Sequence, residues 1–352
     1  MENLKIIKTL GSGLFGTTYK VIDTKTKKNY ALKKQKILKA YITGGTKYYM
    51  WRELRFYIWI NKLIKSDQNF FMKMIDYKFY SDCSYTNENQ PDAKNKIIKK
   101  LIRSKHCLDL LLDLKDGTLN DILKKSKSAL KLILSEKQIF SMIIQITYIC
   151  YLLNKSSYVH NDLHGGNISF TKVPYNKEIL MYINGNKYKI KSYGYQWSII
   201  DYGLILHKKF IMTKKEQNTY KNGILYNKDM KTFFIYALTN ISSLIRKKQK
   251  KTFIVNQLFN KRQELYQRIK FLITSIYPSM NKFYKDYELN EKVNKLLFSE
   301  IIQYLSIYDI KFLEECFGKK IKQNNILNTH LEFFKFNQNN YENIIKYFIE
   351  LC

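Results

Sequence analysis

Two acidic side chains and one amide lie in two short polar segments, each of which follows an apolar run. Asp162 and Asn167 are five residues apart in a segment with the sequence HNDLHGGN, and Asp201 begins an Asp-Tyr-Gly after two isoleucines. A carboxylate and an amide oxygen are ligands of the kind that Mg²⁺ takes together with phosphate oxygens. A further carboxylate can accept the proton of a hydroxyl. The pattern predicts Asn167 and Asp201 as metal ligands and Asp162 as the residue that orients an attacking hydroxyl.

A glycine-rich turn near the N-terminus has the composition of a phosphate-binding loop. Its three glycines let the backbone turn tightly and approach phosphates without a Cβ in the way. The chain leaves one strand pattern and enters another, so we expect a hairpin flap over ATP, whereas a dinucleotide-binding fold would begin a helix within the glycines. The residues expected to contact the nucleotide here are Leu10, Gly11, Ser12, Gly13, Leu14, Phe15, Gly16, Thr17 and Thr18.

A lysine follows this loop at a spacing that suits phosphate binding. Lys33 ends the strand-like Tyr-Ala-Leu-Lys and comes 17 residues after Gly16. It can pair with the α- and β-phosphates and with a glutamate on a helix, for which Glu53 is the candidate. Ala31 shares the face of Lys33 and would lie over a flat base, whereas Lys34 should point to the opposite face.

The N-terminal elements that must position these groups are mostly strands. Alternating apolar residues predict strands within 4–34, then at 70–80 and 107–114, and a helical stripe covers 50–65. Asp113 and Leu114, at the end of the last strand, are expected to offer backbone groups to adenine, with Leu112 at the back of the pocket. Arg52 and Arg55 are expected at the surface.

The pattern becomes helical further along the chain. Ser135 and Gln138 form a capping box that opens an apolar helix to about residue 153, and 229–352 has mainly helical patterns. Asn184-Gly185 suits the type I′ turn of a hairpin. Asp229 is either an anchor for the backbone of the HNDLHGGN segment or a simple N-cap.

Composition limits the function classes. The net charge of +32 raises nucleic acid as a partner, but the charge is spread along the chain and only six residues are arginine, so we favour coding bias as its origin. Five widely spaced cysteines argue against a disulfide framework or a zinc site and fit a reducing compartment. With neither a signal-peptide pattern nor a membrane-span pattern, we expect a cytoplasmic protein.

Taken in order, these motifs resemble the eukaryotic-type protein kinase superfamily, over about residues 4–240. The form His-Asn-Asp-Leu-His-x-x-Asn is most similar to the kinases of large DNA viruses, such as poxviruses and giant viruses. The resemblance implies an α+β, two-lobed fold with a β-rich N-lobe (1–114) and a helical C-lobe (115–352). It also implies ATP and Mg²⁺ as cofactors, transfer to Ser or Thr of a protein substrate, and a location in the host cytoplasm or virion.

Several positions depart from the family pattern. Asn161 stands where an arginine would make control by a phosphorylated activation loop plausible, and His164 stands in place of a lysine that helps to hold the γ-phosphate. Tyr202 replaces the usual phenylalanine, and Thr18 replaces a valine near adenine. The 34 residues between Asn167 and Asp201 imply an inserted hairpin.

Three alternatives follow. One is a small-molecule phosphotransferase of the aminoglycoside or choline type, which shares the His-x-Asp-Leu-His-x-x-Asn pattern. Another is a non-catalytic scaffold of kinase shape, against which the retention of Lys33, Asp162, Asn167 and Asp201 argues. Binding of nucleic acid as the main task is the third, and it rests on charge alone. The sequence leaves the oligomeric state and the substrate open.

Overall fold

The structure is a computed structural model, and it places most of the first two thirds of the chain. The residues described are 1, 3–13, 16–81, 83, 104–128, 134–225 and 228–233, together with 341, 342, 345, 346 and 349. Leu14 and Phe15, residues 84–103 and most of the predicted helices beyond residue 233 lie outside this set.

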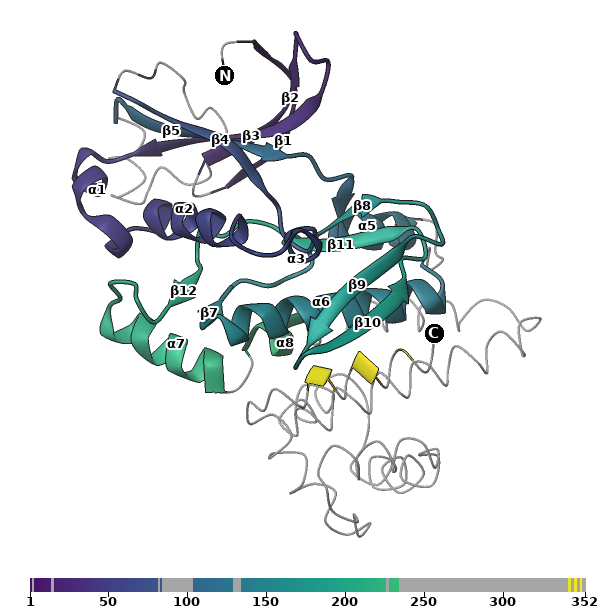
Figure 1. Cartoon of the computed structure of the whole chain (residues 1–352). Helices are drawn as coiled ribbons and strands as arrows, with labels where there is room; N and C mark the ends of the chain where they lie inside the picture. The colour runs from purple at the N-terminus through teal and green to yellow at the C-terminus, as the bar shows by residue number, and fades with distance from the viewer. Residues whose placement is uncertain are drawn as a thin grey trace, which may run out of the picture.

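An antiparallel five-stranded sheet forms the upper part of the molecule (Figure 1). Its order is β1-β2-β3-β5-β4. The strands are β1 (Leu4–Gly13), β2 (Gly16–Asp23), β3 (Asn29–Ile37), β4 (Met74–Tyr80) and β5 (His106–Asp113). The turn between β2 and β3 forms locally, because the Asp23 carboxylate accepts hydrogen bonds from the amides of Lys25 and Thr26. The predicted strands are therefore confirmed, with boundaries shifted by a few residues.

Helix α2 (Tyr49–Ile60) lies under this sheet, preceded by α1 (Lys39–Thr43) and a 3₁₀ turn (Gly45–Lys47) and followed by α3 (Lys65–Gln68) (Figure 1). The helical stripe predicted a single helix to residue 65, but α2 ends at Ile60, with Asn61 as its C-cap. Ile64, with a ψ of 151°, is extended, and α3 starts after it.

Arg52 and Arg55 both lie on α2, and only one of them is exposed. Arg55 is at the surface, as predicted. The same prediction for Arg52 is wrong, since its side chain is buried. The reason is a carboxylate 164 residues away in the sequence, Glu216, which pairs with it. No local pattern could reveal that partner.

The second part of the structure is built around α6 (Glu136–Lys155). The predicted capping box forms, since Ser135 accepts from the Gln138 amide and Gln138 accepts from the Ser135 amide. Every residue from 139 to 153 is buried, so this helix is central to the core. Around it lie β6 (Gly117–Thr118), α5 (Leu119–Ser128), β7 (Tyr158–Val159), β8 (Ile168–Lys172), β11 (Tyr195–Ile199), β12 (Leu206–His207), α7 (Lys214–Leu225) and α8 (Lys228–Phe233).

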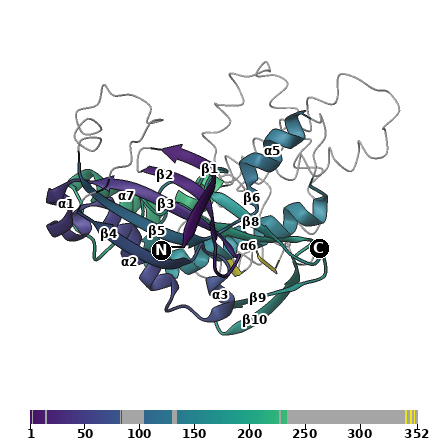
Figure 2. The ribbon, with the colours of Figure 1, turned by 90° about the horizontal axis from the view of Figure 1, so that it is seen from above.

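The predicted insertion is a hairpin of β9 (Glu178–Ile183) and β10 (Asn186–Lys191). Asn184 and Gly185 both have positive φ, 51° and 84°, as a type I′ turn requires. The hairpin lies at the end of the molecule away from α1 and α7 (Figures 1 and 2).

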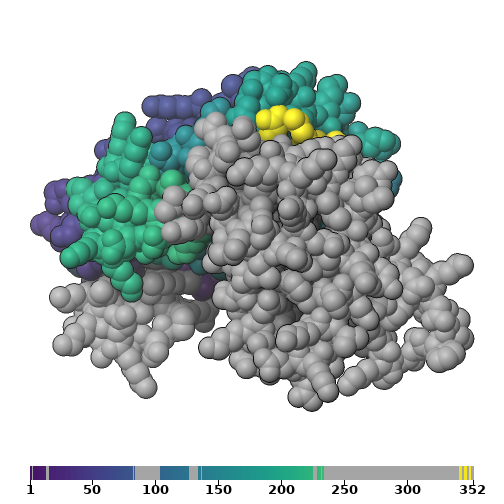
Figure 3. All heavy atoms as spheres, turned by 90° about the horizontal axis from the view of Figure 1, so that it is seen from below, coloured from purple at the N-terminus to yellow at the C-terminus, as the bar shows by residue number. Residues whose placement is uncertain are grey.

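Residues near the C-terminus pack against this hairpin. Asn184 and Asn186 donate hydrogen bonds of 2.8 and 2.9 Å to the Glu342 carboxylate, and the Tyr188 hydroxyl donates to it as well. Tyr341 packs edge-on against Tyr151 of α6. Figure 3 shows these C-terminal residues in yellow against the teal surface of the middle of the chain.

Cys83 and Cys107 form a disulfide, contrary to the expectation from the sequence. They are 24 residues apart, but the Cys83 amide donates to the carbonyl of Lys105, which places Cys83 beside the start of β5. The spacing pattern could not show this pairing. In the described part of the chain, no helix is both long and apolar enough to span a membrane.

Candidate active site

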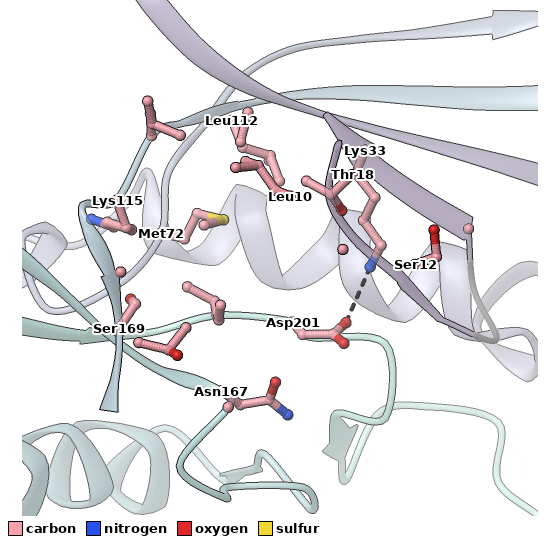
Figure 4. A pocket seen from close by; sticks show the side chains of 18 of the residues that line it. Leu10, Ser12, Thr18, Lys33, Met72, Leu112, Lys115, Asn167, Ser169 and Asp201 are labelled. Carbon is pink, nitrogen blue, oxygen red and sulfur yellow. Dashed lines mark hydrogen bonds and ion pairs between the residues drawn. The ribbon is translucent and has the colours of Figure 1, made fainter. Parts of the chain in front are cut away.

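Lys33 joins three elements at the centre of the structure. Its ammonium lies 2.9 Å from Glu53 Oε1 on α2 and 3.1 Å from Asp201 Oδ1 (Figure 4). Glu53 is buried, and its second oxygen accepts a 3.2 Å hydrogen bond from Gln35, two residues along β3 on the same face as Lys33. Lys34 lies on the other face and pairs with Asp109, as strand alternation predicts.

Electrostatics keep this cluster charged. Burial acts to lower the pKa of Lys33, but the carboxylates of Asp201 and Glu53 outweigh it and raise that pKa above its ordinary value. The Lys33 ammonium in turn lowers the pKa of Asp201. Lys33 is therefore a cation and Asp201 an anion at neutral pH, so the site offers both a phosphate-binding charge and a metal-binding charge.

A cavity of about 480 Å³ opens beside this cluster. That volume suits a nucleotide-sized ligand. Ten of the predicted nucleotide and metal residues line it, and Glu53 does too; the ten are Leu10, Gly11, Ser12, Gly16, Thr18, Ala31, Lys33, Leu114, Asn167 and Asp201. Figure 4 shows Leu10, Thr18 and Leu112 on the sheet side, with Asn167 and Asp201 opposite.

The glycine-rich segment is a strand-to-strand hairpin. β1 and β2 pair through Gly13 with Gly16 and Ser12 with Thr17, so the predicted strand-to-strand hairpin is confirmed over the helix start of a dinucleotide-binding fold. Gly16 has a φ of 133°, and a Cβ on it would lie 2.1 Å from the carbonyl oxygen of Lys34. Only glycine fits this position without moving the neighbouring strand.

Some predicted residues lie outside the cavity lining. Gly13 and Thr17 stand toward the tip of the flap, where the Thr17 and Ser12 hydroxyls are 3.1 Å apart. Asp113 turns away, because its carboxylate accepts from the Lys73 amide at 2.6 Å and pairs with Lys115 at 2.8 Å. Its own amide donates to the Lys73 carbonyl, so adenine would meet the residues after it.

Asp162 and Asn167 lie together, as their spacing predicts. The Asn167 amide nitrogen donates to Asp162 Oδ2 at 3.1 Å and to the Asp162 carbonyl at 2.8 Å. The Asn167 carbonyl accepts from the Ile200 amide, next to Asp201, at 2.9 Å. The ladder of β8 with β11, which pairs Ile168 with Ile199, thus brings Asn167 beside Asp201 across the 34-residue separation.

The HNDLHGGN segment is held from beneath by Asp229. Its carboxylate accepts from the amides of His160 at 2.6 Å and Asn161 at 2.8 Å, which confirms it as an anchor of this backbone. The His160 ring bonds the Ile200 carbonyl at 3.0 Å and braces the loop. Asn161 and Asp201 have φ of 68° and 60°, a strained conformation that such anchoring can maintain. Burial raises the pKa of Asp229 despite these hydrogen bonds.

His164 lies at the edge of the cavity. Its Nδ1 accepts from the Gly166 amide at 3.0 Å, so the other ring nitrogen, Nε2, carries the proton. That nitrogen is 3.7 Å from Asp162 Oδ2. The imidazole therefore lies beside the Asp162 carboxylate.

The donor set fits Mg²⁺. The Asp201 carboxylate is partly exposed. The side-chain nitrogen of Asn167 donates to Asp162, and Figure 4 shows the side-chain oxygen of Asn167 on the side of Asp201. Two protein oxygens suffice for Mg²⁺, which keeps waters and takes phosphate oxygens as its other ligands. Within the described residues, no cluster of three or more His, Cys, Asp or Glu could hold a metal by itself.

Comparison with known proteins gives little beyond this geometry. No family model and no curated protein matches the chain. Among the solved structures that match, one is described as the crystal structure of the PF14_0431 kinase domain. It is 20% identical, with a TM-score of 0.40 over 60% of this chain and 54% of that one. The chain thus spans about half of that protein's length.

Sequence reasoning missed several cavity residues. The cavity is also lined by Tyr57, Met72, Gly117, Thr118 and Ser169. Met72 follows two phenylalanines in an apolar run, which indicates burial but no site. The short pairing of β6 with β8, Gly117 with Phe170 and Thr118 with Ser169, is a tertiary contact with no local sequence signal.

Proposed function

We propose that the protein is an ATP-dependent protein kinase that transfers the γ-phosphate to Ser or Thr hydroxyls. The observation that carries this proposal is the position of Lys33 between Glu53 and Asp201, inside a cavity covered by the glycine-rich flap. A buried cation held by a helix glutamate beside a metal-binding carboxylate is the arrangement that phosphoryl transfer from ATP needs.

Each site residue has a role in this proposal. The flap from Leu10 to Thr18 covers the phosphates, and Lys33 contacts the α- and β-phosphates while Glu53 positions it. Ala31 and Leu114 contact adenine, and the backbone after Asp113 supplies its hydrogen bonds. These roles assign 1–114 to an N-lobe and 115–352 to a C-lobe of one kinase domain.

The chemistry is mainly positioning and charge neutralisation. Asn167 and Asp201 would hold Mg²⁺, which neutralises charge on the phosphates when it is bound. Asp162 orients the substrate hydroxyl and takes its proton. The hydroxyl oxygen forms a bond to the γ-phosphorus, the bond from that phosphorus to the bridging oxygen breaks, and ADP leaves. His164 would donate a hydrogen bond from its Nε2–H to the γ-phosphate and keep that proton.

The closest rival is a small-molecule phosphotransferase, which shares the pattern around Asp162. The complete glycine flap and the Asp201-Tyr-Gly favour a protein substrate. The form of the HNDLHGGN segment supports a kinase of the large-DNA-virus type, which would act in the host cytoplasm or the virion. Retention of all four charged or polar site residues, with Lys33 paired, argues against a scaffold.

The deciding experiment is transfer of γ-labelled phosphate from Mg-ATP to a panel of acidic and basic proteins, with Asp162→Asn in parallel. We expect label on protein that is absent with the variant. Label on hydroxylated metabolites such as choline or aminoglycosides, and none on protein, would favour the rival. No transfer by a folded wild type to any acceptor would refute both enzymes and favour the scaffold.

A further inference from the structure

Arg52 connects α2 to the segment that follows Asp201. Its Nη1 lies 2.6 Å from Glu216 Oε1 and its Nη2 lies 3.3 Å from Oε2, so the guanidinium contacts both oxygens of the carboxylate. Nη2 also donates to the carbonyl of Ile211 at 2.9 Å. A two-pronged arginine–carboxylate pair fixes orientation as well as distance. Arg52 is only 5% exposed, so solvent screens this pair weakly.

The same guanidinium also fixes the entry to α2. Its Nε donates to the carbonyl of Thr46 at 2.7 Å, just before the helix. Thr46 in turn accepts, through its hydroxyl, from the Ile211 amide at 3.1 Å. The segment after Asp201 and the start of α2 are therefore joined at two points, one of them through a charged pair. The next residue on α2 is Glu53, the partner of Lys33.

Glu216 is held in place by its own helix. The Thr213 amide donates to Glu216 Oε2 at 2.8 Å, and the Glu216 amide donates to the Thr213 hydroxyl at 3.2 Å, which is a capping box at the start of α7. Arginine binding and helix capping together hold the pKa of Glu216 below its usual range even though burial acts to raise it. The carboxylate is thus preorganised to receive Arg52.

The segment after Asp201 has almost no hydroxyl group that could be phosphorylated and so give Arg52 an anionic partner other than Glu216. Residues 203–212 contain no Ser, Thr or Tyr, so none of them can be phosphorylated on a hydroxyl. Tyr202 is fully buried with its hydroxyl hydrogen-bonded, and the Thr213 hydroxyl serves the capping box. In many kinases a phosphate added to this region orders it by pairing with arginine. Here the carboxylate of Glu216 already pairs with Arg52 without any modification.

We infer that Arg52 is a positioning residue that, paired with Glu216, holds α2 so that Glu53 reaches Lys33 without any modification of the segment after Asp201. This inference rests on the proposed function. The inference extends the proposed function by naming the residues that set the active arrangement. It also implies that the unmodified protein is fully active.

The test is a double-mutant cycle between Arg52→Met and Glu53→Gln, with kcat for protein phosphorylation as the readout. We expect Arg52→Met alone to lower kcat about hundredfold, the size of effect that a 1 Å displacement produces. In the Glu53→Gln background the same change should lower kcat little further, because its effect passes through Glu53. Equal losses in both backgrounds would show a merely structural role and overturn the inference.

Two controls sharpen the cycle. Arg55→Met removes an exposed arginine from the same helix and should leave kcat unchanged. Glu216→Gln keeps an oxygen to accept from Thr213 and Arg52 but removes the charge, so its loss should be intermediate. Phosphatase treatment of the wild type should not change kcat; a fall in kcat together with loss of phosphate from residues 202–225 would contradict the inference.

Hydrogen exchange separates this inference from the proposed function. If the wild type transfers phosphate to no acceptor, the proposed function fails, yet the connection can still be measured. Arg52→Met should then speed amide exchange in α2 and leave α6 unchanged, whereas Arg55→Met should change neither. If a folded Arg52→Met variant shows unaltered amide exchange in α2, the inference is overturned.

Discussion

The Tyr202 hydroxyl accepts a 2.8 Å hydrogen bond from the backbone amide of Met72, although the two residues are 130 positions apart. The same hydroxyl donates to the Ile199 carbonyl at 2.7 Å. The ring contacts Phe56 and Tyr57 of α2. Tyr202 thus ties the residue after Asp201 to the segment before β4 and to α2.

Tyr202→Phe tests this tie. The Met72 amide keeps a second acceptor, the Ile199 carbonyl at 3.1 Å, so no amide is left unpaired. We therefore expect the free energy of unfolding to fall by about 1 kcal/mol, the typical net value of one hydrogen bond. Urea denaturation measures it. Tyr77→Phe, at an exposed position on β4, is the control and should be neutral.

Asp162→Asn and Asp201→Asn should each abolish turnover while circular dichroism remains that of the wild type, but they should differ in nucleotide binding. Asp201→Asn removes a proposed metal ligand and a partner of Lys33, so Mg²⁺ should no longer strengthen ATP binding. Asp162→Asn leaves both proposed metal ligands, and Mg²⁺-dependent ATP affinity should persist. Calorimetric titration of ATP with and without Mg²⁺ decides this. Wild-type turnover in either variant would refute the assignment.

Asp229→Asn should weaken both stability and turnover. Asp229 accepts hydrogen bonds from the backbone amides of His160 and Asn161. In the variant, one of these amides would face an NH₂ group and lose its acceptor. We expect a loss of about 2 kcal/mol in unfolding free energy. Turnover should fall strongly, since Asp162 follows directly. Asp116→Asn, an exposed carboxylate that accepts only from the Lys172 amide among the described contacts, should leave turnover unchanged.

Glu342 gives a pH-dependent contribution to stability. Burial acts to raise its pKa, but the hydrogen bonds from Tyr188, Asn184 and Asn186 outweigh this and lower it from 4.5 to about 2. Its stabilisation is therefore fully present above pH 4.5 and is lost as the pH falls toward 2. A shift of this size corresponds to at most about 3 kcal/mol.

Comparing wild type with Glu342→Gln by urea denaturation checks this. The difference in unfolding free energy should be largest near pH 7 and should shrink as the pH is lowered below 4.5. Glu178→Gln on the same hairpin breaks an exposed pair with Lys189 and should change stability by less than about 1 kcal/mol at any pH. If the difference in unfolding free energy stays constant across this range, the hydrogen bonds to Glu342 do not make the pH-dependent contribution.

The local parts of the fold were readable from the sequence, because period and turn chemistry carry them. Alternation placed Ala31 and Lys33 on one face, the capping box marked the start of α6, and Asn184-Gly185 predicted the hairpin turn. Spacing alone also brought Asp162 and Asn167 together. In each case the relevant partners lie within a few residues or on one strand.

Contacts between distant segments were not readable. Arg52 was expected at the surface because nothing nearby in the sequence explains its burial. The disulfide of Cys83 with Cys107 depends on how the chain runs beside β5. The hydrogen bonds from Asn184 and Asn186 to Glu342 join residues more than 150 positions apart, and no periodicity in the sequence predicts them.

The ladder of β8 with β11 has a consequence for tolerance of change. It comprises five residue pairs, from Ile168 with Ile199 to Lys172 with Tyr195, and it fixes how Asn167 lies beside Asp201. The chain that loops out beyond Lys172 does not enter that relationship. The body of the β9–β10 hairpin must be kept, because Ile179, Met181 and Ile183 are buried in the core, but an insertion at the exposed Gly185 should leave Asn167 beside Asp201. A reporter domain carried there would follow the protein without disturbing the proposed metal site.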